Sequence, residues 1–195
     1  MPANSYGIIV EGDYDAAVYR AVIGRLASHD VYVKALSCGG RTNLMRKFPG
    51  LLRALEREID GSPVDMAVVI RDADGKNPEE VEAQMQATIQ GRQYPFRLGV
   101  HLHAVRNALE SWLLADPNAI SAVVQKRTGR RVTRSRSNDA PEDRLDAKET
   151  FRKLLIEHGV SSTPLVYSEI AHEIKRDVLL QACPRFRLFS ELVDC

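Results

Sequence analysis

Residues 66–75, MAVVIRDADG, decide the fold class of this chain. The first five residues form a continuous apolar run, which is typical of a central strand buried on both faces of a parallel sheet. Residues 6–10 and 31–36 have a similar β-rich composition, and stretches with helical spacing follow at 13–26 and 44–59. Strands that alternate with helices in this way predict an α/β fold with a mostly parallel sheet.

The alternation continues once more and then gives way to helices. Residues 77–90 predict a helix with proline and acidic residues in its first turn, and residues 96–105 predict a fourth strand. Right-handed crossovers favour the Rossmann-like strand order 2-1-3-4 with flanking helices. We therefore predict an α/β domain at residues 1–118 and a helical C-terminal extension at 119–195, packed on the same core.

The extension is predicted to contain helices at 148–158 and 168–181 and a mobile, charged loop near 126–143. Basic residues of this loop could contact nucleic-acid phosphates, and such contacts would be sensitive to salt. Acidic residues follow closely, and a charge run is usually a solvated surface, so both interpretations stay open. The basic residues are Lys126, Arg127, Arg130, Arg131, Arg134 and Arg136.

The composition excludes several classes of protein. The chain carries 27 basic and 26 acidic residues, a formal net charge of +1, so it is not a polycation. No apolar run approaches the ~18 residues of a membrane span, and the N-terminus lacks the order of a signal peptide. Three scattered cysteines do not form a disulfide framework or a zinc motif. We expect free thiols and a cytoplasmic protein.

Acidic residues follow the first and third predicted strands, at Glu11 and at Asp72 and Asp74. In the order 2-1-3-4 these strands are neighbours, and ligands bind at the carboxyl ends of parallel strands. In extended backbone Asp72 and Asp74 would point the same way, roughly 6 to 7 Å apart, with room for one divalent ion. With no basic partner nearby, the clustered carboxylates would repel one another. Oxygen ligands favour Mg²⁺ or Mn²⁺, which suit phosphodiester chemistry.

Residues 10–15, VEGDYD, and residues 72–75, DADG, together resemble the TOPRIM domain of topoisomerases, primases and OLD-type nucleases. The resemblance covers about residues 6–115, and both motifs match in order and spacing. Residues 109–116, LESWLLAD, further resemble an uncharacterised TOPRIM-like family that is often associated with ATPase-containing defence systems.

The resemblance implies that Glu11 is a general acid/base or a metal ligand and that Asp72 and Asp74 hold Mg²⁺. Asp15 lies where some nuclease members carry a further acidic residue, and Glu110 is another candidate ligand. For both, the alternative is an acid in the first turn of a helix, favoured by the helix dipole. Lys148 is a candidate for stabilising the charge that develops in phosphoryl transfer, with a helix-surface lysine as the alternative.

We therefore predict Mg²⁺- or Mn²⁺-dependent hydrolysis of nucleic acid, DNA rather than RNA, by an endonuclease that works with an ATPase partner. One alternative is a non-catalytic module of the same fold that binds a metal, a nucleotide or a partner. A lower alternative is a receiver-like phosphoacceptor domain, whose usual arrangement of acids fits this chain poorly. His101 and His103 alternate with apolar residues and are predicted to be structural.

Overall fold

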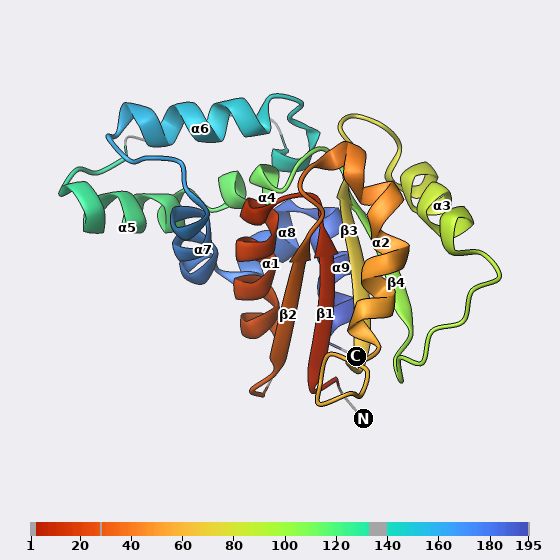
Figure 1. The fold of residues 1–195 in the computed structure, drawn as a ribbon. Helices are drawn as coiled ribbons and strands as arrows, with labels where there is room; N and C mark the ends of the chain where they lie inside the picture. Colours follow the sequence, from red (N-terminus) through yellow and green to blue (C-terminus); the bar gives the residue numbers. More distant parts are fainter. Residues whose placement is uncertain (1–2, 28, 133–139, 195) are drawn as a thin grey trace.

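A single parallel sheet forms the centre of the molecule in the computed structural model, which describes residues 3–27, 29–132 and 140–194. Its strands are β1 (Ser5–Val10), β2 (Tyr32–Ser37), β3 (Met66–Asp72) and β4 (Val100–Val105). They lie in the order β2-β1-β3-β4, and every pair is parallel (Figure 1). The predicted α/β fold class and strand order are therefore confirmed.

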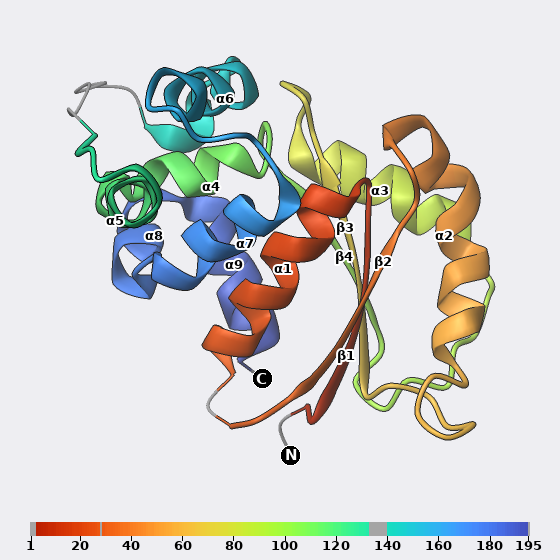
Figure 2. The ribbon, with the colours of Figure 1, turned by 60° about the vertical axis from the view of Figure 1, so that its left-hand side comes forward.

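Helices cover both faces of the sheet (Figure 2). One face packs against α2 (Arg41–Leu55) and α3 (Pro78–Ile89), and the other against α1 (Asp13–Leu26) and C-terminal helices. Val68 and Val69 belong to opposite cores because successive side chains of a strand alternate between the two faces. The remaining helices are α4 (Glu110–Ala115), α5 (Pro117–Thr128), the 3₁₀ turn η1 (Pro141–Asp143), α6 (Ala147–Glu157), α7 (Pro164–Glu173), α8 (Arg176–Ala182) and α9 (Pro184–Val193).

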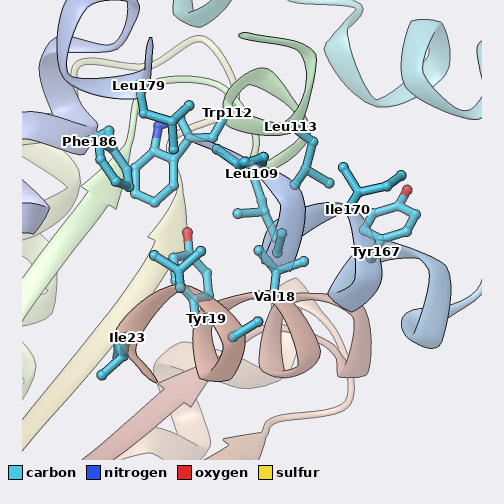
Figure 3. Packing of buried hydrophobic residues seen from close by; sticks show 14 of the residues in the cluster. Val18, Tyr19, Ile23, Leu109, Trp112, Leu113, Tyr167, Ile170, Leu179 and Phe186 are labelled. Atoms are coloured by element: carbon cyan, nitrogen blue, oxygen red, sulfur yellow. The ribbon is translucent and has the colours of Figure 1, made fainter. Parts of the chain in front are cut away.

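Aromatic side chains tie the C-terminal helices to α1. Trp112 of α4 makes edge-to-face contacts with Tyr19 of α1 and with Phe186 of α9, at ring-centroid distances of 5.8 and 5.0 Å. Figure 3 shows Tyr19 and Trp112 in the same buried cluster as Tyr167 and Ile170 of α7. The helices after residue 118 thus share the core of β1, β3 and α1, while the predicted division at that residue stays a prediction.

Four predicted boundaries differ from the structure. The strand predicted at 96–105 begins only at Val100, as β4. Residues 168–181 are not one helix: α7 ends at Glu173 because the Lys175 amide donates to Asp116 Oδ2 at 3.0 Å instead of extending the helix. The helix predicted at 44–59 is α2, which begins and ends earlier. The predicted loop at 126–143 begins too early, because α5 continues until Gly129 adopts a left-handed φ of 71°. Residues 133–139 of that loop lie outside the described residues.

In the described part of the chain, no helix has both the length and the apolar character needed to cross a membrane.

Candidate functional site

The carboxyl ends of β1 and β3 bring Glu11 and Asp72 to the same edge of the sheet, where α4 and α6 add Glu110 and Lys148. The helix α6 lies beyond the carboxyl ends of the strands (Figure 1). Asp15, in the first turn of α1, completes the group, and the charges of these residues act on one another. We call this group the acidic edge: Glu11, Asp15, Asp72, Asp74 and Glu110, with Lys148.

Asp72 is a buried member of the acidic edge. It is the last residue of β3, and only 7% of it is exposed. Burial, together with the charges of Asp15 and Glu11, raises the pKa of Asp72 well above its usual 3.8. Lys148 Nζ lies 3.8 Å from Asp72 Oδ2 and opposes this shift. Asp72 thus combines a buried carboxylate with one nearby ammonium group.

Lys148 keeps its charge in this setting. Burial lowers the pKa of Lys148, but the charges of Glu110, Asp72 and Asp15 outweigh that effect and the net shift is upward. The lysine belongs to the first turn of α6, after Asp146, and reaches toward β3 from a different layer of the fold. A protonated amine therefore faces the acids at neutral pH.

Glu11 directly follows β1, and its backbone carbonyl accepts a hydrogen bond from the Gly40 amide at 2.7 Å. Burial, followed by the charges of Asp15 and Asp74, raises the pKa of Glu11 from 4.5 to about 7. Its Oε1 atom is buried and has no hydrogen-bond partner among the described residues. Arg71 Nε lies 3.9 Å away, beyond ordinary hydrogen-bond range. Glu11 is thus a carboxyl group that can exchange a proton near neutral pH.

Asp74 does not share the surroundings of Asp72. The strand ends at Asp72, and Asp74 lies in a turn with a left-handed φ of 49°. Its Oδ2 atom pairs with Arg41 of α2 at 2.9 Å, whereas Asp72 faces Lys148. The expectation of extended backbone through both aspartates is therefore wrong, because the Ala73 and Asp74 amides bond to carbonyls of Val105 and Asn107 and bend the chain.

Asp15 and Glu110 both combine a helix-end position with a place in the acidic edge. Asp15 Oδ2 accepts the Gly12 amide at 2.8 Å, which caps α1, and burial raises the pKa of Asp15 to about 6. Glu110 opens α4 and is 3% exposed; its Oε1 accepts the Tyr167 hydroxyl at 3.1 Å. Its Oε2 is buried without a hydrogen-bond partner in the described structure. Tyr167 of α7 thus fixes one oxygen of Glu110 and leaves the other free.

Basic partners lie beside three of the acids, contrary to the expectation of a cluster without them. The pairs are Arg71 with Glu11, Arg41 with Asp74 and Lys148 with Asp72. Over residues 3–27, 29–132 and 140–194, no three acidic, histidine or cysteine side chains are arranged so that they could hold a metal ion. The acids are near one another, but their oxygens face lysine and arginine side chains.

Sequence reasoning missed Arg71 and Tyr167, and it favoured a tight turn over a phosphate site for residues 39–42, GGRT. Arg71 had a detectable signal, because it interrupts the otherwise apolar strand β3 directly before Asp72. Arg41 follows the Gly-Gly turn, and Tyr167 lies in an amphipathic helix, at a position that no pattern would single out.

The basic residues predicted to contact nucleic acid are not part of the acidic edge; the described ones lie at and after the end of α5. Lys126 and Arg127 are in the last turn of α5, and Arg130 and Arg131 follow it. Arg127 makes two hydrogen bonds to Glu169 of α7, at 2.7 and 2.8 Å. Arg134 and Arg136 lie outside the described residues. Arg127 therefore already has an acidic partner.

His103 is structural, as predicted. It is buried beside the rings of Trp112 and Phe189, and burial, with a smaller contribution from Arg185, lowers its pKa from 6.5 to about 3. His101 Nε2 lies 2.8 Å from the Leu98 carbonyl oxygen.

A pocket of about 590 Å³ adjoins the turn that carries Asp74. Its walls come from the β3–α3 loop, from the residues after β4 and from the segment around η1, and Arg106 pairs with Asp143 there at 2.9 Å. A volume of this size is typical of sites for small ligand groups. The lining residues are Gly75, Lys76, Asn77, Pro78, Glu79, Arg106, Asn107, Asp143 and Leu145.

Solved structures with similar chains share little sequence with this one. A hypothetical protein from Pyrococcus horikoshii OT3 has a TM-score of 0.55 at 15% identity, over 99% of this chain and 100% of that one. The C-terminal region of the Xanthomonas campestris pv. campestris OLD protein has a TM-score of 0.48 at 17% identity, over 96% and 93%. The corresponding region from Burkholderia pseudomallei has 0.48 at 16%, over 99% and 98%. The Pyrococcus match shows a shared fold.

No curated protein matches this chain. A family model matches residues 10–193, which is nearly the whole sequence. The match includes all the residues of the acidic edge. The chain therefore belongs to the family described as a domain of unknown function, DUF4276.

Proposed function

We propose that this chain is a TOPRIM-like nuclease module that hydrolyses nucleic-acid phosphodiesters with Mg²⁺ or Mn²⁺. The observation that carries the proposal is the acidic edge, where burial raises the pKa of Glu11, Asp15 and Asp72 together. Desolvated carboxylates at the carboxyl ends of parallel strands are costly to the fold, and such perturbed groups cluster at functional sites. The sequence resemblance to TOPRIM domains supports the same conclusion.

The carboxylate oxygens are the type of donor that a hard divalent cation prefers, although no three of the acids are arranged to hold one among the described residues. Glu11 Oε1 and Glu110 Oε2 are buried carboxylate oxygens without a hydrogen-bond partner in the described chain, and such atoms normally have one. Oxygen ligands are those that Mg²⁺ and Mn²⁺ prefer. We propose that Glu11, Asp72 and Asp74 hold the cation, with Asp15 and Glu110 as further ligands. A bound cation would polarise a phosphoryl oxygen and lower the pKa of a water molecule.

The residues of the chain then have separate roles. A carboxyl group with a pKa of about 7, such as Glu11, can accept or donate a proton at neutral pH, as a general acid/base must. The protonated Lys148, 3.8 Å from Asp72, can oppose negative charge that develops on the phosphoryl group. Asp72 and Asp74 act as ligands, and Tyr167 positions Glu110.

The substrate and partner follow from the same resemblance. We propose DNA rather than RNA as the substrate, and an ATPase supplied by a partner protein. The basic residues at the end of α5 (Lys126, Arg127, Arg130 and Arg131) are proposed phosphate contacts, although Arg127 must release Glu169 to act as one. The pocket beside Asp74 offers space for a nucleotide next to the cleaved bond.

One observation favours a second candidate, a non-catalytic module of the same fold. Each of Glu11, Asp72 and Asp74 has a basic side chain within 4 Å. These ion pairs partly compensate the acids without any metal. In that case the acidic edge would stabilise the fold and the chain would bind a partner or nucleotide elsewhere.

The test compares two aspartates that differ in burial. Wild type, Asp72→Asn and the exposed α8 control Asp177→Asn are incubated with plasmid DNA and with RNA in Mg²⁺ and in Mn²⁺. We expect cleavage by the wild type and the control, and at least ~100-fold less by Asp72→Asn. Calorimetric titration with Mn²⁺ should lose its saturable phase only in Asp72→Asn. Cleavage that is equal in all three proteins, or no saturable Mn²⁺ binding by the wild type, excludes the nuclease proposal.

A further inference from the structure

Arg71 is a nearly buried arginine near the carboxyl end of β3. It directly precedes Asp72 in β3, so that its side chain leaves the opposite face of the strand. Only 12% of the side chain is exposed, and Nε is completely buried. Among the described residues, the guanidinium donates no hydrogen bond, and its nearest acid is Glu11 Oε1 at 3.9 Å. A guanidinium has five N–H donors, and leaving them unpaired when buried is costly.

Glu11 compensates this charge incompletely. The 3.9 Å separation exceeds a hydrogen bond, and Glu11 itself has an unpaired buried oxygen. Arg71 is therefore a nearly buried cation with no carboxylate at hydrogen-bond distance among the described residues.

A second arginine flanks the same turn. Arg41, the first residue of α2, pairs with Asp74 at 2.9 Å, and about half of its side chain is exposed. The Gly40 amide before it bonds to the Glu11 carbonyl, which places the start of α2 beside the end of β1. Arg41 and Arg71 therefore approach Glu11 and Asp74 from the α2 side, whereas Lys148 meets Asp72 from α6. On the α2 side, the acidic edge is therefore flanked by two basic side chains, Arg41 and Arg71.

We propose that Arg71 and Arg41 form a phosphate-binding subsite for the backbone of a nucleic-acid strand, next to the acidic edge. Guanidinium groups bind phosphate oxygens through paired N–H donors. A phosphate oxygen would thus supply the acceptor that Arg71 lacks among the described residues. In the free protein both arginines rest against Glu11 and Asp74, so the positive charges are not left isolated. This proposal rests on the proposed function, because it assigns the phosphate backbone of the proposed substrate to Arg71 and Arg41.

The experiment measures binding without cleavage. A fluorescent single-stranded 12-nucleotide DNA is titrated with wild type, Arg71→Gln, Arg41→Gln and the exposed control Arg92→Gln, in EDTA and over a range of salt. We expect each subsite variant to weaken binding about tenfold and to reduce the slope of log Kd against log salt by ~0.7, the value for one phosphate contact on a single strand. The control should match the wild type. Unchanged binding by both subsite variants overturns the proposal.

Titration with Mn²⁺ separates the subsite from a merely structural role. If Arg71 only holds Glu11 in place, Arg71→Gln weakens Mn²⁺ binding and leaves DNA binding unchanged, which overturns the proposal. The subsite predicts weaker DNA binding with Mn²⁺ affinity equal or higher, because a positive charge near Glu11 is removed. Arg71→Lys keeps the charge, and its DNA affinity should lie between wild type and Arg71→Gln. The exposed variant Arg41→Gln carries the test if Arg71→Gln does not fold.

Two further arms identify the source of the phosphate and separate this proposal from the nuclease proposal. Adenosine monophosphate should compete with the DNA only at far higher concentration, whereas equal affinity would overturn the assignment to a nucleic-acid strand. DNA binding that depends on both arginines in a protein that never cleaves would remove the nuclease proposal and keep the subsite.

Discussion

The carboxyl edge of the sheet and the end of α5 both carry clustered charges, but Asp72 and Glu110 of the first cluster are buried, whereas the second cluster is solvated. At the edge, burial raises the pKa of Asp72 well above its usual range. At the end of α5, the hydrogen bonds from Arg127 lower the pKa of Glu169, and about a third of each side chain is exposed. The two pKa shifts have opposite directions because burial destabilises the charged form of Asp72, whereas a partly exposed ion pair stabilises the charged form of Glu169.

The segment around η1 leads into the helix α6, which brings Lys148 to Asp72 of the acidic edge. Glu142 anchors this segment: its carboxylate accepts the Trp112 indole N–H at 2.7 Å and the Arg185 amide at 3.0 Å. The Asn107 side-chain amide donates to the Glu142 carbonyl at 2.7 Å. One buried acid therefore connects β4, α4 and α9 to the segment that leads into α6, and thus to Lys148.

The largest effect on stability should come from Glu142→Gln. The substitution keeps the volume, but it replaces one accepting oxygen by an NH₂ group that faces N–H donors. Losing charged hydrogen bonds at a site that is 2% exposed should lower the free energy of unfolding by about 3 kcal/mol. Urea denaturation monitored by Trp112 fluorescence measures the change.

Glu149→Gln is the matched control for Glu142→Gln. Glu149 pairs with Lys153 four residues away on α6, and most of its side chain is exposed, so its loss should cost less than about 0.5 kcal/mol. Equal urea midpoints for the two variants would contradict the contrast between buried and solvated acids.

The next effect is a pH dependence that originates in the core beside the acidic edge. The pKa of His103 falls from 6.5 to about 3 in the folded protein, mainly through burial. The neutral ring is therefore favoured by folding: its contribution is complete above pH 6.5 and is lost as the pH falls toward 3. Between pH 6.5 and 5 the loss should reach about 2 kcal/mol, at 1.36 kcal/mol per pH unit.

His103→Phe should remove that part of the pH dependence, whereas the exposed variant His172→Phe should keep it. Unfolding free energies at pH 5 and pH 7.5 give the difference for each protein. A wild-type difference that survives in His103→Phe would assign the acid sensitivity to other groups.

The fold was predictable because it depends on the spacing of apolar residues within each strand and helix, which the local sequence shows. The apolar run of β3 and the helices that follow β1 and β2 determine a parallel sheet, and right-handed crossovers determine its order. That order placed Glu11 and Asp72 together, sixty residues apart in the chain. The break between α7 and α8 was not predictable, because Asp116 binds the Lys175 amide from a distant part of the sequence.

The pairing of charges at the site could not be predicted for the same reason. Arg41 meets Asp74 and Lys148 meets Asp72 across different layers of the fold, and no periodicity relates these positions. The separate surroundings of Asp72 and Asp74 follow from a single left-handed residue in a turn. Sequence patterns predict that the acids share one edge of the sheet, but tertiary packing determines which basic side chain each acid faces.

The smallest effect should come from the pair at the end of α5. A double-mutant cycle with Arg127→Gln and Glu169→Gln should give a coupling free energy of about 0.5 kcal/mol, because both side chains are partly exposed. The coupling should shrink further at 0.5 M salt, where exposed charges are screened over roughly 4 Å. Thermal or urea unfolding of the four proteins measures it.

The same pair tests whether the end of α5 contacts nucleic acid. Glu169→Gln frees Arg127 from its two hydrogen bonds, so if Arg127 contacts a phosphate, this variant should bind the 12-nucleotide DNA about twofold more tightly. Arg71 makes no hydrogen bond to an acid of the described chain that it would have to release, and its loss should weaken binding of the same DNA about tenfold. Tighter binding by Glu169→Gln would extend the DNA contact to α5; unchanged binding would confine it to the flank of the acidic edge, where only 12% of the Arg71 side chain is exposed.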